Sequence, residues 1–405
     1  MSSKNWTVNY DYSIRYTRWL LRILGIWYLV ATKQIKIEKY LSKFILPLAS
    51  VTMTTLTLPV CCYIILRPID HLELIVLLGP VLSQSANILM HFAMVLRADT
   101  LKICIQHMEL DWQRIETAIE RDIMTRHVRF SHTLTIACIT FIYTGGALFY
   151  SLIMPLMAPN TINEFNETIR PLPFPGNDIF FDVQTDFVYE IVFTINFIAA
   201  IFHYTVITAV CNIAIVLVSH ACGQIQIVIW NLKNFVDQNT LQSDPTYVLK
   251  NRIGFIIERH IRLLKFSSNI EKALKEIFLL EVVSSTLIMC FIEYDILIAL
   301  EKKVTDRLGM ITYVLLFCSY TFNLFLYCLF GEVLKEQCQQ IGKVAYSIDW
   351  YKLPSKTQIA LIMVINMGDY PFKLTAGGIM ELSISNFASI TKTSVAYLNM
   401  MRTMG

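Results

Sequence analysis

A row of small and hydroxyl residues near the carboxyl end is the part of the sequence best suited to chemistry. Steps of three or four positions along the chain give Ser385, Ser389, Thr393, Ala396, Met400 and Thr403. These positions share one face of a helix. Such a face suits a water-filled path with an apolar constriction at Met400, because apolar rings can close a pore by dewetting. Small polar residues also favour close helix packing, so both interpretations stay open.

Two ionisable residues belong to the same segment. Glu381 stands near its start, and Lys392 lies within it. An ionisable side chain inside a bilayer is costly unless it faces water or a partner. We therefore expect Lys392 either to influence ion passage or to pair with a neighbouring helix.

A second candidate site consists of aromatic residues in the outer halves of several apolar stretches. Small apolar ligands bind in concave, mostly aromatic cavities, often between the helices of a bundle. Aromatic residues at a membrane interface can also act only as anchors, and this explanation stays open for each of them. The candidate ligand-binding residues, one of them a glycine, are Tyr143, Gly146, Tyr150, Phe193, Phe197, Tyr294, Tyr313, Phe317 and Tyr320.

Long apolar helices are the elements that would position both sites. Of the 405 residues, 55% are hydrophobic and only 16% are charged, against roughly 25% charged in soluble proteins. Six stretches are long enough to cross a ~30 Å hydrocarbon core. They are about 44–66, 72–96, 131–157, 187–218, 277–300 and 308–331.

A seventh, weaker span follows a break in the chain. Ile359 to Met367 is a short apolar piece, and Gly368 to Pro371 interrupts it. A half-polar helix is then expected from about 377 to 402. Proline and glycine at the break favour two separate pieces.

The distribution of basic residues predicts the orientation. The segments on one side, 1–43, 97–130, 219–277 and 332–356, carry 26 Lys and Arg, and those on the other side carry five. Because basic residues are retained in the cytoplasm, we place the amino terminus inside and the carboxyl terminus outside. This topology is opposite to that of a G-protein-coupled receptor. The inner stretches 98–127 and 249–277 have helical apolar spacing, so they either project into the cytoplasm or lie on the membrane.

Two glycan acceptor sequons fall on opposite sides of this topology. Asn166-Glu167-Thr168 lies in the acidic outer loop 158–186, so Asn166 is the predicted glycosylation site. Asn5-Trp6-Thr7 lies on the inner side, so we expect it to remain unglycosylated.

Other functional classes find no support in the sequence. We find no HExxH, GxSxG, GxxxxGK or GxGxxG pattern, and Gly145-Gly146 and Gly377-Gly378 are isolated pairs. Ten scattered cysteines form no CxxC pair, and the small net charge of +3 comes without a basic run. We therefore expect no enzyme, no cofactor, no metal site and no nucleic-acid partner.

An ordered set of residues near the carboxyl end consists of Gly331-Glu332, Ala345-Tyr346-Ser347, Trp350-Tyr351, Leu353-Pro354, Pro371, Leu374-Thr375-Ala376-Gly377, Phe387, Lys392, Ser394 and Tyr397. Through this set, the carboxyl-terminal segment resembles the insect odorant receptor family. Length, seven spans, inverted topology and long inner helices agree over the rest of the chain. The gustatory-type closing pattern and the long inner insert of the co-receptor are missing, so the chain resembles a ligand-tuning subunit.

The resemblance implies a non-selective cation channel gated by a volatile, mostly apolar odorant. It implies a heterotetramer with the odorant co-receptor in the plasma membrane of a sensory dendrite, surrounded by membrane lipids. Met400 would be the apolar gate and Thr403 part of the polar rim. Trp350, Tyr351 and Pro354 would belong to a cytoplasmic anchor between subunits. A metabotropic seven-span receptor and a gustatory-type channel are the alternatives.

These expectations define an all-α integral membrane protein with four regions. Residues 1–43 form a cytoplasmic segment with an interfacial helix, and 44–331 form six spans with cytoplasmic helical extensions. Residues 332–376 form the cytoplasmic anchor and the first part of the seventh helix. Residues 377–405 form the pore-lining part of that helix and a short extracellular tail.

Overall fold

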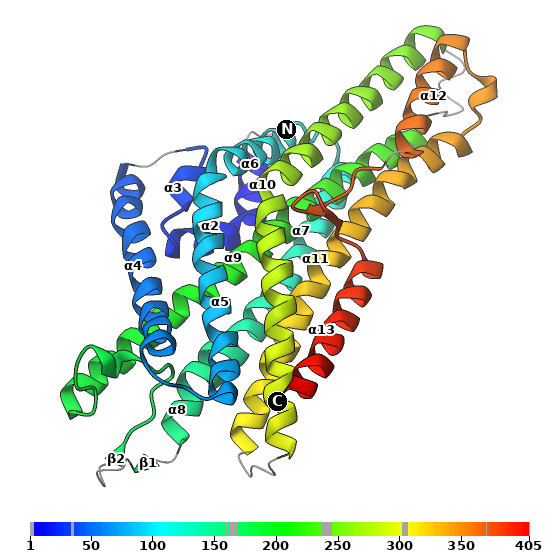
Figure 1. Cartoon of the computed structure of the whole chain (residues 1–405). Helices are drawn as coiled ribbons and strands as arrows, with labels where there is room; N and C mark the ends of the chain where they lie inside the picture. Colours follow the sequence, from blue (N-terminus) through cyan, green and yellow to red (C-terminus); the bar gives the residue numbers. More distant parts are fainter. Residues whose placement is uncertain are drawn as a thin grey trace.

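The chain folds into a bundle of long helices (Figure 1). The computed structural model describes residues 4–33, 36–158, 161–162, 168–235, 245–301, 307–369 and 371–404. The helices are α1 (Lys4–Ser13), α2 (Arg15–Ile23), α3 (Trp27–Val30), α4 (Lys36–Leu66), α5 (His71–Leu96), α6 (Ala98–Gln113), α7 (Ala118–Ile142), α8 (Met154–Met157), α9 (Asp186–Lys233), α10 (Pro245–Glu301), α11 (Arg307–Ser347), α12 (Ser355–Asp369) and α13 (Ile384–Met404).

Short elements complete the described chain. A π-helical stretch, η1 (Tyr143–Ile153), joins α7 to α8. The 3-10 turns are η2 (Asn177–Ile179) and η4 (Trp350–Lys352). Two antiparallel hairpins pair β1 (Thr161–Ile162) with β2 (Thr168–Ile169) and β3 (Thr375–Ala376) with β4 (Met380–Glu381).

The predicted all-α membrane fold is confirmed. Within the described residues, six helical segments are long and apolar enough to cross a bilayer, and they contain the six predicted spans. The most buried is Asp186–Lys233, because 83% of its 18-residue apolar stretch lies inside the protein. This helix, α9, packs against α4, α7, α10 and α11, so it forms the centre of the bundle.

Three helices are much longer than a membrane is thick. Helices α9, α10 and α11 contain 48, 57 and 41 residues, which corresponds to roughly 60–85 Å at 1.5 Å per residue. Their extra length, with α12, forms an arm at the upper right of Figure 1. Helix α10 is continuous from Pro245, so the stretch 249–277 extends the bundle as a projecting helix.

The amino-terminal helices pack into the bundle. Leu20, Leu21 and Leu24 are at most 1% exposed, and α2 lies against α9. Thr17 Oγ1 donates to Asn212 Oδ1 (2.7 Å), and Asn212 Nδ2 donates to Thr135 Oγ1 (2.9 Å). The stretch expected as an interfacial helix therefore has its apolar side covered by protein. A polar chain fixes it to α9 and α7.

The seventh helix begins later than expected. The sequence pattern placed its start at about 377, but α13 begins at Ile384. Gly377 and Gly378 have φ values of 65° and 75°, a region that favours glycine. They form the turn of the β3–β4 hairpin instead of a helix. The Gly377 amide donates to the Lys275 carbonyl (2.7 Å), which holds the turn against α10.

Two glycines allow α12 to fold back closely along α11. A Cβ added to Gly368 would lie 2.7 Å from Gly342 Cα. A Cβ on Gly342 would lie 3.0 Å from Gly368 Cα. These are backbone atoms, which cannot rotate away, so any side chain here must separate the helices.

We predict that Gly368→Ala destabilises the arm by about 1–3 kcal/mol, as overpacking does in other tightly packed interiors. The measurement is thermal denaturation of the purified full-length protein in detergent. Gly254→Ala on α10 is the matched control, because no atom lies within 4 Å of its added Cβ. Equal melting temperatures for the two variants would contradict the close contact.

Candidate ligand cavity, pore helix and polar cluster

A cavity of about 80 Å³ lies between α4, α5, α9, α10 and α11. Phe174, from the segment after β2, also lines it and packs against Tyr150 with 5.6 Å between ring centroids. Apolar wall residues include Phe291 and Leu316. The cavity is thus a largely apolar hollow between helices, as is common for small-molecule sites.

Three of the nine residues expected at a ligand site line this cavity. Tyr150 comes from η1, and Tyr313 and Tyr320 come from α11. The Tyr320 hydroxyl is 2.7 Å from the Ser83 hydroxyl of α5. Residues separated widely in sequence therefore meet at one wall.

The other six residues do not line this cavity. Tyr143 bonds to the Thr205 hydroxyl (2.7 Å), and Tyr294 is only 4% exposed. An added Cβ at Gly146 would be 2.2 Å from the Tyr204 ring, so this glycine is a packing position. The remaining three also lie outside the cavity lining: Phe193, Phe197 and Phe317.

A site prediction based on aromatic residues alone missed the polar residues of the cavity. Ser83, Gln84 and Asn87 line it from α5, His203 from α9 and Asp295 from α10. The available signal was the presence of these polar residues within apolar spans, where such groups are costly and often functional. Because α5 supplies no aromatic residue to this wall, a search for aromatic clusters passed over it.

Hydrogen bonding assigns a role to His203. Its Nε2 is 3.3 Å from the Met53 carbonyl oxygen. A carbonyl only accepts, so Nε2 carries the proton, and Nδ1 of the neutral ring is left as an acceptor. Within the described residues, His203 Nδ1, both amide atoms of Gln84 and Asp295 Oδ1 are buried without a hydrogen-bond partner.

The candidate pore residues share the uncovered face of α13. Ser385, Ser389, Thr393 and Ala396 are exposed, and Met400 is 52% exposed. The Thr403 side chain lies outside the described residues. Lys392 is also exposed. The stripe is therefore not buried against the helices of its own chain, which removes packing within the chain as its explanation.

The opposite face of α13 is held by α10 and α11. Ser394 is fully buried, and its hydroxyl donates to Glu293 Oε1 on α10 (3.1 Å). Phe387 packs edge-on against Phe325 of α11, with ring centroids 5.4 Å apart. Glu293 lies two positions before Asp295, so α10 contacts α13 and the cavity at nearly the same level.

The β3–β4 hairpin fixes the start of α13. Glu381 accepts from Lys335 of α11 (2.7 Å) and Lys373 (2.8 Å). These two ammonium groups hold the pKa of the Glu381 carboxyl below its usual value, with burial opposing them. On the other side, Glu271 of α10 accepts from the Thr375 amide (3.0 Å). The hairpin is thus tied to both neighbouring helices.

The candidate anchor residues lie between α11 and α12. Tyr351 is 62% exposed and Trp350 is 37% exposed, while Pro354 is half-buried. The rings of Trp350 and Tyr351 meet nearly at right angles, 6.2 Å apart. This aromatic pair leaves apolar area uncovered on the single chain. Asn166, the candidate glycan acceptor, lies outside the described residues.

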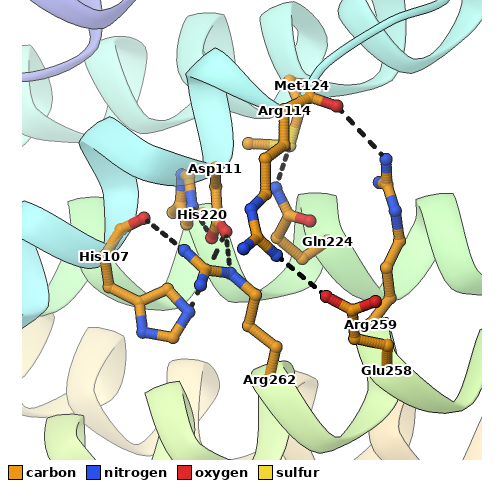
Figure 2. Close-up of polar contacts among 9 residues, drawn as sticks. All are labelled: His107, Asp111, Arg114, Met124, His220, Gln224, Glu258, Arg259 and Arg262. Atoms are coloured by element: carbon orange, nitrogen blue, oxygen red, sulfur yellow. Dashed lines mark hydrogen bonds and ion pairs between the residues drawn. The ribbon is translucent and has the colours of Figure 1, made fainter. Parts of the chain in front are cut away.

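A buried polar cluster joins α6, α9 and α10 (Figure 2). Asp111 accepts from Arg262 Nε (2.5 Å) and from His220 Nε2 (2.9 Å). Burial acts to raise the pKa of Asp111, but the His220 hydrogen bond and the charges around it hold that pKa below its usual value. Burial also lowers the pKa of His107 to about 4, against the opposing charge of Asp111.

The cluster continues into paired residues at its edge. Arg259 contacts Glu120 of α7 (3.0 Å). Figure 2 shows the second pair, in which Arg114 contacts Glu258 (3.2 Å). A cavity of about 220 Å³ lies among these residues. Since every described arginine of the group contacts a carboxylate, the arrangement is a set of polar pairs that links α6, α7, α9 and α10.

Comparison with known proteins identifies the family. Residues 72–395 match the 7tm odorant receptor family. The chain belongs to that family. With its six long apolar helices, it is a multi-pass membrane protein, and receptor membership points away from an enzyme.

Similar odorant receptors occur in flies and mosquitoes. Odorant receptor 22c of Drosophila melanogaster is 24% identical over 155 residues, which cover 38% of this chain and 37% of the relative. Odorant receptor 13a of the same species is 22% identical over 57% of this chain and 58% of the relative. The odorant receptor coreceptor of Aedes albopictus is 23% identical over 41% and 35%. The matches thus span between about a third and three fifths of these relatives.

A solved odorant receptor has the same fold. The insect olfactory receptor OR5 from Machilis hrabei superimposes with a TM-score of 0.75, covering 98% of this chain and 100% of that one. Sequence identity is only 14%. The arrangement of helices is therefore shared even where few residues are.

We predict that Arg262→Gln destabilises the protein by on the order of 3 kcal/mol, because it removes a charged partner from buried Asp111. Denaturation of the purified full-length protein measures the loss. Arg126→Gln is the matched control: Arg126 pairs with Asp122 at 3.2 Å, but both side chains are more than 60% exposed. It should cost under about 1 kcal/mol. Equal losses would show that the buried cluster adds no stability.

Proposed function

We propose that this odorant receptor is the ligand-binding subunit of a cation channel and works in a heterotetramer with an odorant co-receptor. Family membership and the similarity to coreceptors support this assignment. One observation carries it: α10 lines the cavity and also holds the helix with the uncovered polar stripe. A ligand and a pore can therefore act on the same element.

The cavity is the proposed ligand site. A structure of OR5 was solved in complex with eugenol, a small aromatic molecule. In this chain, a ligand between Tyr150 and Phe291 would press on the wall formed by α10. A ligand shifts a conformational equilibrium only by its different affinity for the two states. We propose that the open state holds the ligand better because α10 and α13 move together.

The uncovered face of α13 is the proposed pore lining. Ser389, Thr393 and Ala396 would face water, and Met400 would form the apolar gate, with Thr403 at the rim. Equivalent faces from the other subunits would complete the path. Lys392, on the exposed side, would then influence the passage of cations by its charge.

The proposed orientation places the α12 arm in the cytoplasm and the end with α8 outside. The excess of basic residues on the α12 side supports it. In the arm, Trp350, Tyr351 and Pro354 would meet neighbouring subunits, and Asn166 would carry a glycan outside. We propose the plasma membrane of a sensory dendrite as the location and no catalytic activity.

The deciding experiment is whole-cell recording with an odorant panel. One set of cells expresses this chain alone, and another also expresses an insect odorant co-receptor. Rapid cation current only in the second set supports the proposal. Current carried by this chain alone would show that the channel does not need the co-receptor. A second-messenger response without current would indicate a metabotropic receptor instead.

We predict that Tyr150→Ala shifts the half-maximal ligand concentration by about tenfold or more, which corresponds to roughly 1.4 kcal/mol of binding free energy. The tyrosine ring forms part of the cavity wall. Dose–response curves and surface labelling measure potency and expression. Tyr40→Ala is the matched control, since Tyr40 is 73% exposed and lies outside the cavity. An unchanged Tyr150→Ala curve would move the ligand site elsewhere.

Met400→Ala should increase the current without ligand, because a shorter side chain widens the apolar constriction and lets water enter. The measurement is basal current per surface-expressed channel. Val395→Ala provides the control: Val395 is 46% exposed but lies off the hydroxyl stripe. If Met400→Ala and Val395→Ala leak equally, Met400 is not the gate.

A further inference from the structure

The cavity has polar lining residues that its apolar character does not explain. Asp295, His203 and Gln84 line it from three different helices, α10, α9 and α5. His203 is 3% exposed and Gln84 is 4% exposed. Buried polar groups of this kind normally find a partner, because an unpaired one loses its hydrogen bonds to water without replacing them.

Their polar atoms lack that partner within the described part of the chain. His203 Nδ1, Asp295 Oδ1 and both amide atoms of Gln84 make no hydrogen bond there. By contrast, Ser83 and Tyr320 on the same wall satisfy each other at 2.7 Å. These unpaired atoms all belong to residues that line the cavity, where a polar group of a ligand can meet them.

Most of these unpaired atoms accept hydrogen bonds. His203 Nδ1 is an acceptor because Nε2 donates to the Met53 carbonyl. The Asp295 carboxyl offers acceptor oxygens in either protonation state, and the Gln84 amide offers one more. A ligand group that only accepts would leave His203 Nδ1 unsatisfied, and also Asp295 when its carboxyl is ionised. A hydroxyl or amino group can donate to them.

We propose that the ligand of this receptor is a small molecule with a hydrogen-bond-donating head, a hydroxyl or an amino group. The head binds at Asp295, His203 and Gln84, and the apolar body packs against Tyr150, Phe291 and Leu316. This inference rests on the proposed function for its physiological meaning. It narrows the ligand class from volatile apolar molecules in general to alcohols, phenols and amines. Sites that hydrogen-bond a hydroxyl reject analogues lacking it far more strongly than apolar pockets reject a missing methylene.

The test uses pairs of probes that differ mainly in the head group. They are 4-methylphenol with p-xylene, benzylamine with ethylbenzene, and 1-hexanol and hexylamine each with heptane. One readout is the half-maximal concentration for current with the co-receptor. The other is ligand-induced thermal stabilisation of the purified complex, which reports binding without gating. We expect the donor member of at least one pair to act at a concentration at least about tenfold lower in both readouts.

Substitutions connect the preference for donor probes to the polar lining residues. In Asp295→Leu and in His203→Phe, the donor preference should fall to about twofold or less. Glu190→Leu is the control, because Glu190 is exposed and outside the cavity lining, and its preference should equal that of the wild type. Two independent substitutions are used so that one misfolded variant does not decide the result, and the wild-type comparison needs neither.

Each outcome separates the two proposals. Equal action of both members in every pair, including the absence of any response, overturns the donor inference. Currents evoked by other odorants would then still support the channel. A donor preference in thermal stabilisation without any current supports the inference and overturns the proposed channel function. A wild-type donor preference that survives in both Asp295→Leu and His203→Phe overturns the assignment of the head group to these two residues.

Discussion

Polar groups placed within a lipid bilayer must find their hydrogen-bond partners inside the protein, and the bundle depends on this constraint. Water cannot satisfy them there, so each pairing between helices also fixes how those helices lie. Glu281 of α10 accepts from Asn323 of α11 (2.6 Å) and from Ser285 (3.1 Å). Asn212 of α9 joins α2 to α7 in the same way. Apolar packing alone would leave the rotation and register of such long helices weakly defined.

Helix α10 collects these constraints along its whole length. Arg262 binds Asp111, Glu281 bonds to α11 further along, and Glu293 and Asp295 meet α13 and the cavity. In the proposed mechanism, these fixed points leave the turns of α10 beside the cavity as the part that responds to a ligand. A change in the cavity wall would then reach α13 through the bonds of Glu293 and Cys290 to Ser394 rather than through the whole bundle.

The sequence predicted the spans well because span length and apolar content are local properties. All six predicted stretches lie within long apolar helices, and the break at Gly368 separates α12 from the last segment. The hairpin at Thr375–Glu381 was missed, since its turn depends on contacts with Glu271 and Lys275 of α10, which are distant in sequence. Local composition could not reveal that support.

The candidate site was predicted only in part for a similar reason. Tyr150 and Tyr143 are both aromatic residues of one helical stretch, but one lines the cavity and the other bonds to Thr205. Residue type cannot separate these roles, because lateral neighbours come from other helices. Polar residues within the spans were the stronger signal. Glu281 finds a hydrogen-bond partner within the bundle, whereas Asp295 and Gln84 keep unpaired atoms. The distinction appears only once partners are known.

Two of the regions that depart from internal satisfaction bear on what the single chain lacks. The cavity leaves acceptors at His203 and Asp295 without donors, and α13 leaves the stripe of Ser389 and Thr393 without a covering helix. The unpaired acceptors line a cavity that suits a small molecule. The uncovered stripe runs along a helix face and suits water shared with other subunits of the proposed channel. Because α10 lines the cavity and also contacts α13, the proposed ligand would change the surroundings of the helix that exposes the stripe.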